Sequence, residues 1–241
     1  MPKNLLLFSS SRVGHTDYLE HALPDIQSFV DRNRQIDGPL VFIPYAGISL
    51  GFEQYEEKVQ QAFNNIDLEI RSIHGIKDKL AAIKDAAFII TGGGNTFALL
   101  NSLYQENLIQ PLIKKLENGT PYIGWSAGSN IAGPTIRTTN DMPIIEPPSF
   151  DALNLIPWQL NPHYIDGNPP GHNGETRQQR IEEFLLLNPH SQVIGIPEGT
   201  ALSIENQSIK YIGQTDGFVF NRNGKQAFRN SEQLVQIISK P

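Results

Sequence analysis

A strand-like apolar run passes directly into a string of small residues at Pro121-Tyr122-Ile123-Gly124-Trp125-Ser126-Ala127-Gly128-Ser129-Asn130. The five residues from Gly124 to Gly128 fit the pattern G-x-S-x-G. In that pattern the serine stands on a sharp turn between a strand and a helix, which requires small neighbours and exposes the hydroxyl above the sheet. The stretch therefore predicts a buried strand that ends at a nucleophilic Ser126, although an ordinary glycine-rich turn also fits these five residues.

A second glycine-rich turn comes earlier in the chain. The apolar run Ala87-Phe88-Ile89-Ile90 predicts a strand, and it continues into Thr91-Gly92-Gly93-Gly94-Asn95. The carboxyl ends of parallel strands share one edge of a sheet, where such folds place their sites. Backbone N–H groups of Gly93 or Gly94 can there join that of Ala127 in an oxyanion hole. A phosphate-binding turn is less favoured, because no G-K-[ST] follows and the spacing fails G-x-G-x-x-G.

Strand-like and helix-like segments alternate through the first half of the chain. Strands are expected at residues 4–9, 40–43, 66–73, 87–90 and 121–124, and helices at 16–33, 52–64, 78–84, 96–103 and 108–118. This alternation predicts an α/β fold in which helices cover a parallel sheet.

The second half has a different pattern. Residues 137–180 are rich in proline and lack a long periodic segment, as functional loops often do. Beyond this loop-rich stretch we expect a helix at 177–187, a strand at 193–196, hairpins at 201–212 and 217–228, and a terminal helix at 231–239. No linker, internal repeat or low-complexity tract interrupts the chain, so residues 1–241 are expected to form a single α/β domain.

Composition excludes several classes of protein. The 241 residues carry a net charge of −6, and their basic residues are scattered rather than gathered in a stripe, which argues against nucleic-acid binding. The apolar runs are far too short to span a membrane, and the N-terminal run is too short for a signal peptide. The absence of cysteine excludes disulfides, thiolate zinc sites and cysteine nucleophiles, and a cytoplasmic location is the natural expectation.

A serine nucleophile needs a base, and the chain has six histidines. His163 lies in Leu160-Asn161-Pro162-His163-Tyr164, and His172 lies in Gly171-His172-Asn173-Gly174; both are candidates. The remaining histidines are expected on the surface: His15, His21, His74 and His190. No pair has the H-x-x-x-H spacing of metal ligands, so no metal is expected.

The base in turn needs a carboxylate that holds its tautomer and stabilises the imidazolium. Glu198 follows the strand expected at 193–196, and Asp141 lies in the loop-rich stretch; both qualify. Spacing does not rule out Asp166 or Glu175. For any one of them, a solvated loop charge is the ordinary alternative.

Five motifs occur in a fixed order along the chain: Gly92-Gly93-Gly94-Asn95-Thr96, Gly124–Asn130, Asn161-Pro162-His163, Gly171–Arg177 and Pro197-Glu198-Gly199. Together they resemble the α-aspartyl dipeptidases (peptidase E) of serine peptidase family S51, over roughly residues 4 to 220. The resemblance implies a three-layer sandwich like that of class I glutamine amidotransferases (flavodoxin-like), with serine in place of their cysteine. It also implies hydrolysis of Asp-X dipeptides through an acyl-enzyme, with no metal and no cofactor.

The resemblance assigns roles to particular residues. Ser126 corresponds to the nucleophile and His163 to its base. Asp141 and Glu198 both match family carboxylates, and the sequence leaves the choice of the triad acid open. Arg177 corresponds to the arginine that holds the substrate's aspartyl carboxylate, which suits a guanidinium fork. Without the motif, a helix-surface arginine paired with Glu182 or Glu183 is the simpler interpretation of this arginine.

Two other functions stay open at this point. A cyanophycinase-like peptidase would cleave aspartyl–arginine units of a polymer, and a non-catalytic small-molecule binder would keep only the fold. An α/β-hydrolase esterase is less favoured, because its histidine is expected near the C-terminus. The partner expected here is a small peptide, for a monomer or a homodimer. The sequence does not identify the group that binds the substrate's amine.

Overall fold

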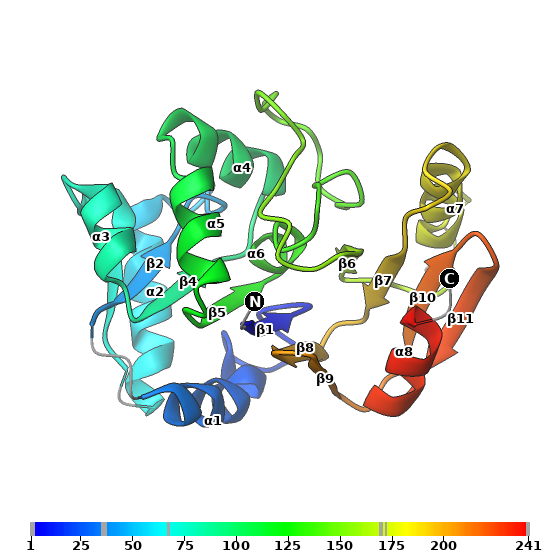
Figure 1. The fold of residues 1–241 in the computed structure, drawn as a ribbon, viewed down its shortest axis with the longest axis horizontal. Helices are drawn as coiled ribbons and strands as arrows, with labels where there is room; N and C mark the ends of the chain where they lie inside the picture. Colours follow the sequence, from blue (N-terminus) through cyan, green and yellow to red (C-terminus); the bar gives the residue numbers. More distant parts are fainter. Residues whose placement is uncertain (1–2, 35–37, 67, 169–170, 172, 240–241) are drawn as a thin grey trace.

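The computed structural model describes residues 3–34, 38–66, 68–168, 171 and 173–239. Two sheets lie side by side within this part of the chain, the larger toward the N-terminal half and the smaller toward the C-terminal half (Figure 1). Of the helices in these residues, none combines the length and the apolar character that a membrane span requires.

The larger sheet contains seven strands among the described residues, in the order β3-β2-β4-β5-β1-β8-β9. The strands are β1 (Asn4–Phe8), β2 (Leu40–Ile43), β3 (Ile70–Ser72), β4 (Phe88–Thr91), β5 (Tyr122–Trp125), β8 (Ala201–Glu205) and β9 (Ser208–Ile212). The strands from β3 to β1 run parallel, and the β8–β9 hairpin adds an antiparallel edge beside β1. The expectation of a central, mostly parallel sheet is confirmed.

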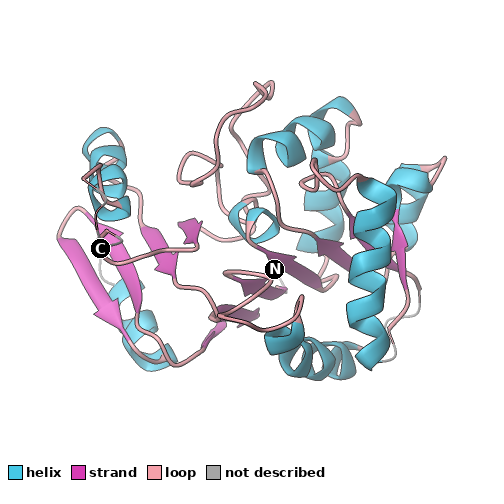
Figure 2. Ribbon diagram, turned by 180° about the vertical axis from the view of Figure 1, so that it is seen from behind, coloured by secondary structure: helices cyan, strands magenta, loops and turns pink. Residues whose placement is uncertain are grey.

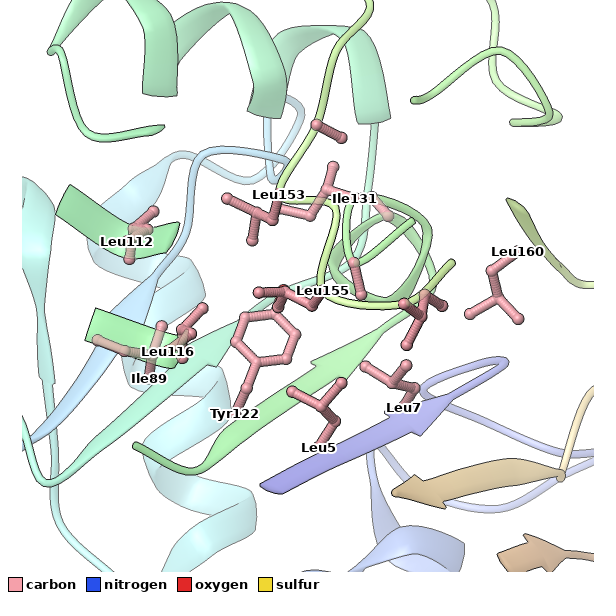
Figure 3. Packing of buried hydrophobic residues seen from close by; sticks show 14 of the residues in the cluster. Leu5, Leu7, Ile89, Leu112, Leu116, Tyr122, Ile131, Leu153, Leu155 and Leu160 are labelled. Atoms are coloured by element: carbon pink, nitrogen blue, oxygen red, sulfur yellow. The ribbon is translucent and has the colours of Figure 1, made fainter. Parts of the chain in front are cut away.

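Helices cover both faces of this sheet (Figure 2). One face is covered by α1 (Leu23–Asn33) and α2 (Phe52–Phe63), and the other by α3 (Lys79–Asp85), α4 (Thr96–Gln105), α5 (Ile109–Glu117) and α6 (Ala127–Asn130). Residues of β1 show the arrangement, because neighbouring side chains point to opposite faces of a strand. Leu5 and Leu7 pack under α5 and α6 (Figure 3), whereas Leu6 and Phe8 pack against α1. Burial on both faces explains why the strands read as continuous apolar runs.

The smaller sheet has the strand order β11-β10-β7-β6. Its strands are β6 (Gln159–Pro162), β7 (Val193–Ile196), β10 (Gly217–Asn221) and β11 (Gly224–Phe228). It packs between α7 (Arg177–Leu187) and α8 (Ser231–Ile238). Val193 belongs to the cluster under α7, whereas Ile194 belongs to the cluster that holds α8, so the two helices cover opposite faces. β6 lies inside the stretch that the sequence predicted to be loop-rich, where the pattern singles out no strand.

Two predicted elements begin or end elsewhere. The helix expected from residue 16 starts with a 3-10 turn at Glu20–Ala22, because Leu19 takes a left-handed conformation with φ 60°. The strand expected over 66–73 shortens to β3, after a 3-10 turn at Asn64–Ile66, and a further 3-10 turn at Ile73–Gly75 follows β3. The side chain of Gln60 binds the backbone there, accepting from the N–H of Ile70 and donating to the carbonyl of Leu68.

Candidate active site

Ser126 sits between the end of β5 and the first residue of α6, in a strained backbone conformation. Its φ of 54° and ψ of −113° are rare for a residue with a side chain. Such strain costs about 1–3 kcal/mol and persists only where the surroundings hold it. The Ser126 N–H donates to the carbonyl of Phe8 at 3.1 Å, and its carbonyl accepts from the N–H groups of Ser129 and Asn130. The serine is thereby held on the sharp turn that the sequence predicted.

The two glycines of the motif are required by close packing. A Cβ on Gly124 would lie 2.6 Å from the carbonyl oxygen of Gly128, and a Cβ on Gly128 would lie 2.2 Å from the carbonyl oxygen of Thr91. Both distances are shorter than any real side chain tolerates. The glycines thus let α6 approach β4 and β5 closely, which brings the Ser126 hydroxyl to the carboxyl edge of the sheet.

His163 connects the serine to a carboxylate. Its Nε2 lies 2.9 Å from the Ser126 hydroxyl oxygen, and its Nδ1 lies 2.8 Å from Oε1 of Glu198. With the ring proton on Nδ1, the imidazole donates to Glu198 and accepts from the serine hydroxyl. The three side chains form the continuous hydrogen-bonded chain that acyl-transfer chemistry needs.

Strand pairing in the smaller sheet brings His163 to Glu198. β6 and β7 are parallel neighbours, and Pro162 stands opposite Ile196 at their carboxyl ends. His163 directly follows β6, and Glu198 follows β7 by two positions, so both leave the sheet at the same edge. The loops at this edge bring Glu198 and His163 together because of that register.

Ser9 ties this edge to the larger sheet. It follows β1 and is fully buried. Its hydroxyl donates to the carbonyl of Ile196 at 2.8 Å and accepts from the N–H of His163 at 2.9 Å. The side-chain amide of Asn130, at the end of α6, adds a second tie at 2.6 Å to the carbonyl of Leu160. Sequence reasoning missed both residues; the polar pair Ser9-Ser10 at the end of an apolar strand was the available signal.

Asp141 lies near the site but has different partners. Its Oδ2 accepts from the N–H of Thr96 at 2.7 Å and from the Thr96 hydroxyl at 2.5 Å. It therefore caps the first turn of α4 beside the N-cap residue Asn95. Within the described residues no hydrogen bond joins Asp141 to His163. Of the two carboxylates that the sequence left open, the structure places Glu198 on the imidazole.

The other candidate carboxylates lie outside the site. Asp166 pairs with Lys225, and Glu175 lies 3.7 Å from Arg180. Among the histidines, His15 and His190 are exposed as expected, whereas His21 and His74 are partly buried, so the surface expectation for those two is wrong. His172 lies outside the described residues.

Three backbone N–H groups near the serine have no acceptor among the described residues: those of Gly93, Gly94 and Ala127. Gly93 approaches the nucleophile closely, since a Cβ there would lie 2.9 Å from the Cβ of Ser126. Gly94 has a φ of 135°, which favours glycine, and it lies in the turn that leads into α4. Unpaired donors beside a nucleophile are the arrangement that stabilises an oxyanion.

Arg177 is the first residue of α7, after the capping residue Thr176. It is half-buried, and within the described part of the chain it makes no hydrogen bond or ion pair. The alternative interpretation, a pairing with Glu182 or Glu183, is not observed among the described residues; Gln178 binds Glu182 instead. Burial, with a contribution from Arg180, lowers the pKa of the Arg177 guanidinium, and the negative charges of Asp141 and Glu198 oppose that shift. A half-buried cation near these carboxylates is available for a ligand.

A cavity of about 600 Å³ opens in front of Ser126 and His163. Its floor includes Trp125, whose indole N–H donates to the hydroxyls of Tyr18 at 3.0 Å and Tyr55 at 3.2 Å. The Tyr55 hydroxyl donates to the carbonyl of Gly93 at 2.9 Å, and burial raises the pKa of Tyr55 to about 12. Arg177 lies outside the residues that line this cavity. No group of three or more metal-ligating side chains occurs in the described residues.

Comparison with known proteins identifies the family. The family model of peptidase family S51 matches residues 5–212. The chain belongs to peptidase family S51. It is 51% identical over 226 residues to a peptidase E of Shewanella denitrificans, an alignment that covers 94% of each chain. It is 50% identical over 217 residues to a peptidase E of Haemophilus influenzae, covering 90% of this chain and 99% of that one.

The fold of this S51 peptidase also matches a solved structure. A peptidase from an acI-B1 actinobacterium superposes with a TM-score of 0.69 over 95% of each chain, at 20% sequence identity. The family and its relatives make this chain a hydrolase, a serine-type dipeptidase.

Proposed function

We propose that this S51 peptidase hydrolyses dipeptides with an N-terminal aspartate, with Ser126 as nucleophile, His163 as general base and Glu198 as the triad acid. The hydrogen-bonded chain from Ser126 through His163 to Glu198 carries the proposal. Arg177 is half-buried and has no hydrogen bond or ion pair among the described residues, which supports the choice of aspartate.

Acylation begins when Oγ of Ser126 attacks the carbonyl carbon of the scissile bond. Nε2 of His163 accepts the hydroxyl proton as the new C–O bond forms. The carbonyl oxygen becomes an oxyanion, which the N–H of Ala127 and that of Gly93 or Gly94 stabilise; each donor contributes about 3 kcal/mol. The C–N bond then breaks, and the imidazolium gives its proton to the departing amine.

Deacylation repeats these steps with water. His163 removes a proton from the water molecule, which attacks the aspartyl ester at Ser126. Collapse of the second tetrahedral intermediate releases aspartate and returns the proton to the serine. Throughout, the carboxylate of Glu198 accepts a hydrogen bond from the Nδ1–H group of His163. This bond keeps Nε2 free to act as a base and stabilises the imidazolium.

Arg177 supplies the charge that an aspartyl substrate requires. A carboxylate that leaves water without a partner is strongly destabilised, so a pocket that prefers aspartate needs a cation. A guanidinium can hold a carboxylate through two parallel hydrogen bonds. Asp141, tied to Thr96, serves in this proposal to hold the start of α4 rather than to assist His163.

The same proposal covers location and partners. We infer a cytoplasmic enzyme that acts on small peptides, because the chain lacks cysteine and carries a net charge of −6 without a basic stripe. It needs neither a metal nor a cofactor for the steps above.

A panel of X-Leu dipeptides tests the proposal, with the purified native enzyme and its Ser126→Ala variant. The native enzyme should prefer Asp-Leu over Asn-Leu and Glu-Leu. The kcat of the variant should be about 10⁶-fold lower, and its melting temperature should equal that of the native enzyme. Aspartyl–arginine polymer serves as the competing substrate. Faster cleavage of the polymer than of Asp-Leu, or substantial turnover by folded Ser126→Ala, would contradict the proposal.

A further inference from the structure

Lys58 is a charged side chain of the cavity wall that the proposed mechanism does not use. It lies on α2, and it lines the same cavity as Ser126 and His163. Among the lining residues that the structure describes, no other lysine and no arginine occurs. The described lining of the cavity thus includes one full positive charge, which α2 contributes.

The surroundings of Lys58 leave that charge without an acidic partner in the described residues. Its Nζ lies 4.4 Å from the centre of the Tyr18 ring, a cation–π contact. Residues three or four positions away on α2 are the ones that could pair with it, and they are Gln54, Tyr55, Gln61 and Ala62. Glu56, on the same helix, accepts instead from the N–H of Ser72 at 2.8 Å.

The aromatic platform under Lys58 is held in place. The Tyr18 hydroxyl donates to that of Tyr55 at 3.0 Å and accepts from the indole of Trp125, which directly precedes Ser126. The ammonium therefore lies over a ring that is hydrogen-bonded to Trp125, the residue directly before Ser126. Three rotatable donors on a flexible stem suit a ligand carboxylate at the open side of a cavity.

The chemistry of the proposed substrate supplies such a group. In a dipeptide the residue that leaves carries a free carboxylate, one residue beyond the scissile bond. In a longer peptide or an amide, a neutral group takes its place. Ile48 and Leu50 line the same cavity, and 50% and 37% of their respective surfaces are exposed. They provide an apolar surface for the side chain of the leaving residue.

We propose that Lys58 binds the C-terminal carboxylate of the dipeptide and thereby makes the enzyme selective for dipeptides over longer chains. This inference rests on the proposed function, because it places the substrate across Ser126. It assigns the two substrate carboxylates to different cations: the terminal one to Lys58 and the aspartyl one to Arg177.

The test compares Asp-Leu with Asp-Leu amide, which differ only in the terminal charge. Lys58→Met removes the charge and keeps the length of the side chain, whereas Lys58→Arg keeps the charge. Lys114→Met, on the exposed face of α5, controls for the loss of one surface charge. The measured quantity is the ratio of kcat/KM for the acid to that for the amide.

The native enzyme should favour the acid by about 10- to 100-fold, the range that one hydrogen bond to a charged group supplies. Lys58→Met should lower kcat/KM for Asp-Leu by that factor and leave the amide nearly unchanged, so that the ratio approaches one. Lys58→Arg and Lys114→Met should keep most of the native ratio. An unchanged ratio in Lys58→Met, or an equal loss for both substrates, would overturn the assignment.

Failure of the aspartate proposal gives a different signal. If the native enzyme prefers another X-Leu dipeptide, the acid and amide of that dipeptide replace Asp-Leu, and the ratio tests Lys58 as before. The Lys58→Met variant could instead change the preference for Asp-Leu over Asn-Leu. That result would show that Lys58 binds the aspartyl side chain, which contradicts the assignment. A native enzyme that cleaves no dipeptide would overturn both proposals.

Discussion

Ser126 and His163 both have a positive φ, 54° at each. Neither is a glycine, so each stores strain that the surrounding hydrogen bonds must offset. For His163 the offset includes the 2.9 Å bond from its N–H to the hydroxyl of Ser9. The hydrogen bonds that offset this strain hold the imidazole and the hydroxyl in fixed relative positions before a substrate binds. Acyl transfer through these two groups would benefit from such pre-organisation.

The first prediction separates the two carboxylates near His163. Glu198→Gln removes the acceptor that holds the Nδ1 proton, and kcat should fall by up to ~10⁴-fold because the imidazole takes the wrong tautomer. Asp141→Asn should leave kcat within roughly tenfold of native and lower the melting temperature, because it weakens a cap worth about 1 kcal/mol. Steady-state kinetics and thermal unfolding of both variants provide the measurement. A large kcat loss in Asp141→Asn with native kcat in Glu198→Gln would exchange the two assignments.

The second prediction concerns Arg177 and specificity. Arg177→Ala should lower kcat/KM for Asp-Leu at least about 100-fold, because each hydrogen bond to a charged group contributes about 1.5–3 kcal/mol and the fork makes two. Asn-Leu hydrolysis should change little, so the preference for Asp-Leu should collapse. Arg180→Ala is the matched control, since Arg180 lies one turn further on α7 and near Glu175. An unchanged Asp-Leu to Asn-Leu ratio in Arg177→Ala would mean that another residue binds the carboxylate.

At the scale of elements, the geometry of the site depends on how closely α6 approaches the sheet. α6 has only four residues, so little of its stability comes from its own hydrogen bonds. It is held instead by contacts with β4, β5 and β6, including the bond from Asn130 to Leu160. A change at this junction therefore moves Ser126 as well as the helix.

The third prediction tests that junction. Gly128→Ala places a methyl group 2.2 Å from the carbonyl of Thr91, and α6 must shift away from β4. The variant should lose about 1–3 kcal/mol of unfolding free energy, the usual cost of overpacking, and its kcat should fall more than its KM rises. Gly75→Ala is the control, because the added methyl group there has no neighbour within 4 Å. Equal stability and activity in the two variants would refute this account of the turn.

At the scale of the whole molecule, the site lies where two sheets meet. The proposed oxyanion donors and nucleophile follow β4 and β5 of the larger sheet, whereas the proposed base and acid follow β6 and β7 of the smaller sheet (Figure 1). Ser9 and Asn130 bind across this junction. The distances among Ser126, His163 and Glu198 therefore depend on the contacts that hold the two sheets together.

The fourth prediction links global stability to pH through His21. Both ring nitrogens are buried without a hydrogen-bond partner in the described structure, and the ring packs edge-on against Phe8. Burial lowers the pKa of His21 below its value of about 6.5 in the unfolded chain, although Asp25, Glu198 and Glu20 oppose the shift. The unfolded chain therefore binds a proton at His21 before the folded chain does as the pH falls. The contribution of the buried, neutral His21 to the free energy of unfolding is complete above about pH 6.5 and is lost as the pH falls below it.

His21→Leu should make the free energy of unfolding less sensitive to acid. Urea unfolding at pH 7.5 and pH 5.0 measures the loss in each protein, with the exposed His190→Leu as control. The native enzyme and the control should show the same loss, and His21→Leu a smaller one. A loss as large in His21→Leu as in the native enzyme would show that other groups govern the acid response.

The sequence by itself determined the features that depend on neighbours along the chain. Apolar runs such as Leu5-Leu6-Leu7-Phe8 predicted strands buried on both faces, and alternating helices predicted the covered parallel sheet; the structure confirms both. The small residues around Ser126 predicted the sharp turn, because a serine on a tight strand-to-helix turn requires small neighbours along the chain. These inferences needed only the periodicity of burial and the volume of side chains.

Only the tertiary structure decided which distant groups meet. Asp141 and Glu198 are equally plausible partners of His163 in the sequence, and the parallel register of β6 with β7 places Glu198 on the imidazole. That register joins segments more than thirty residues apart, with one strand hidden in a proline-rich stretch that has no readable period. Strand pairing, buried links such as Ser9 and the place of Lys58 in the cavity lining arise from long-range packing, which local sequence patterns do not encode.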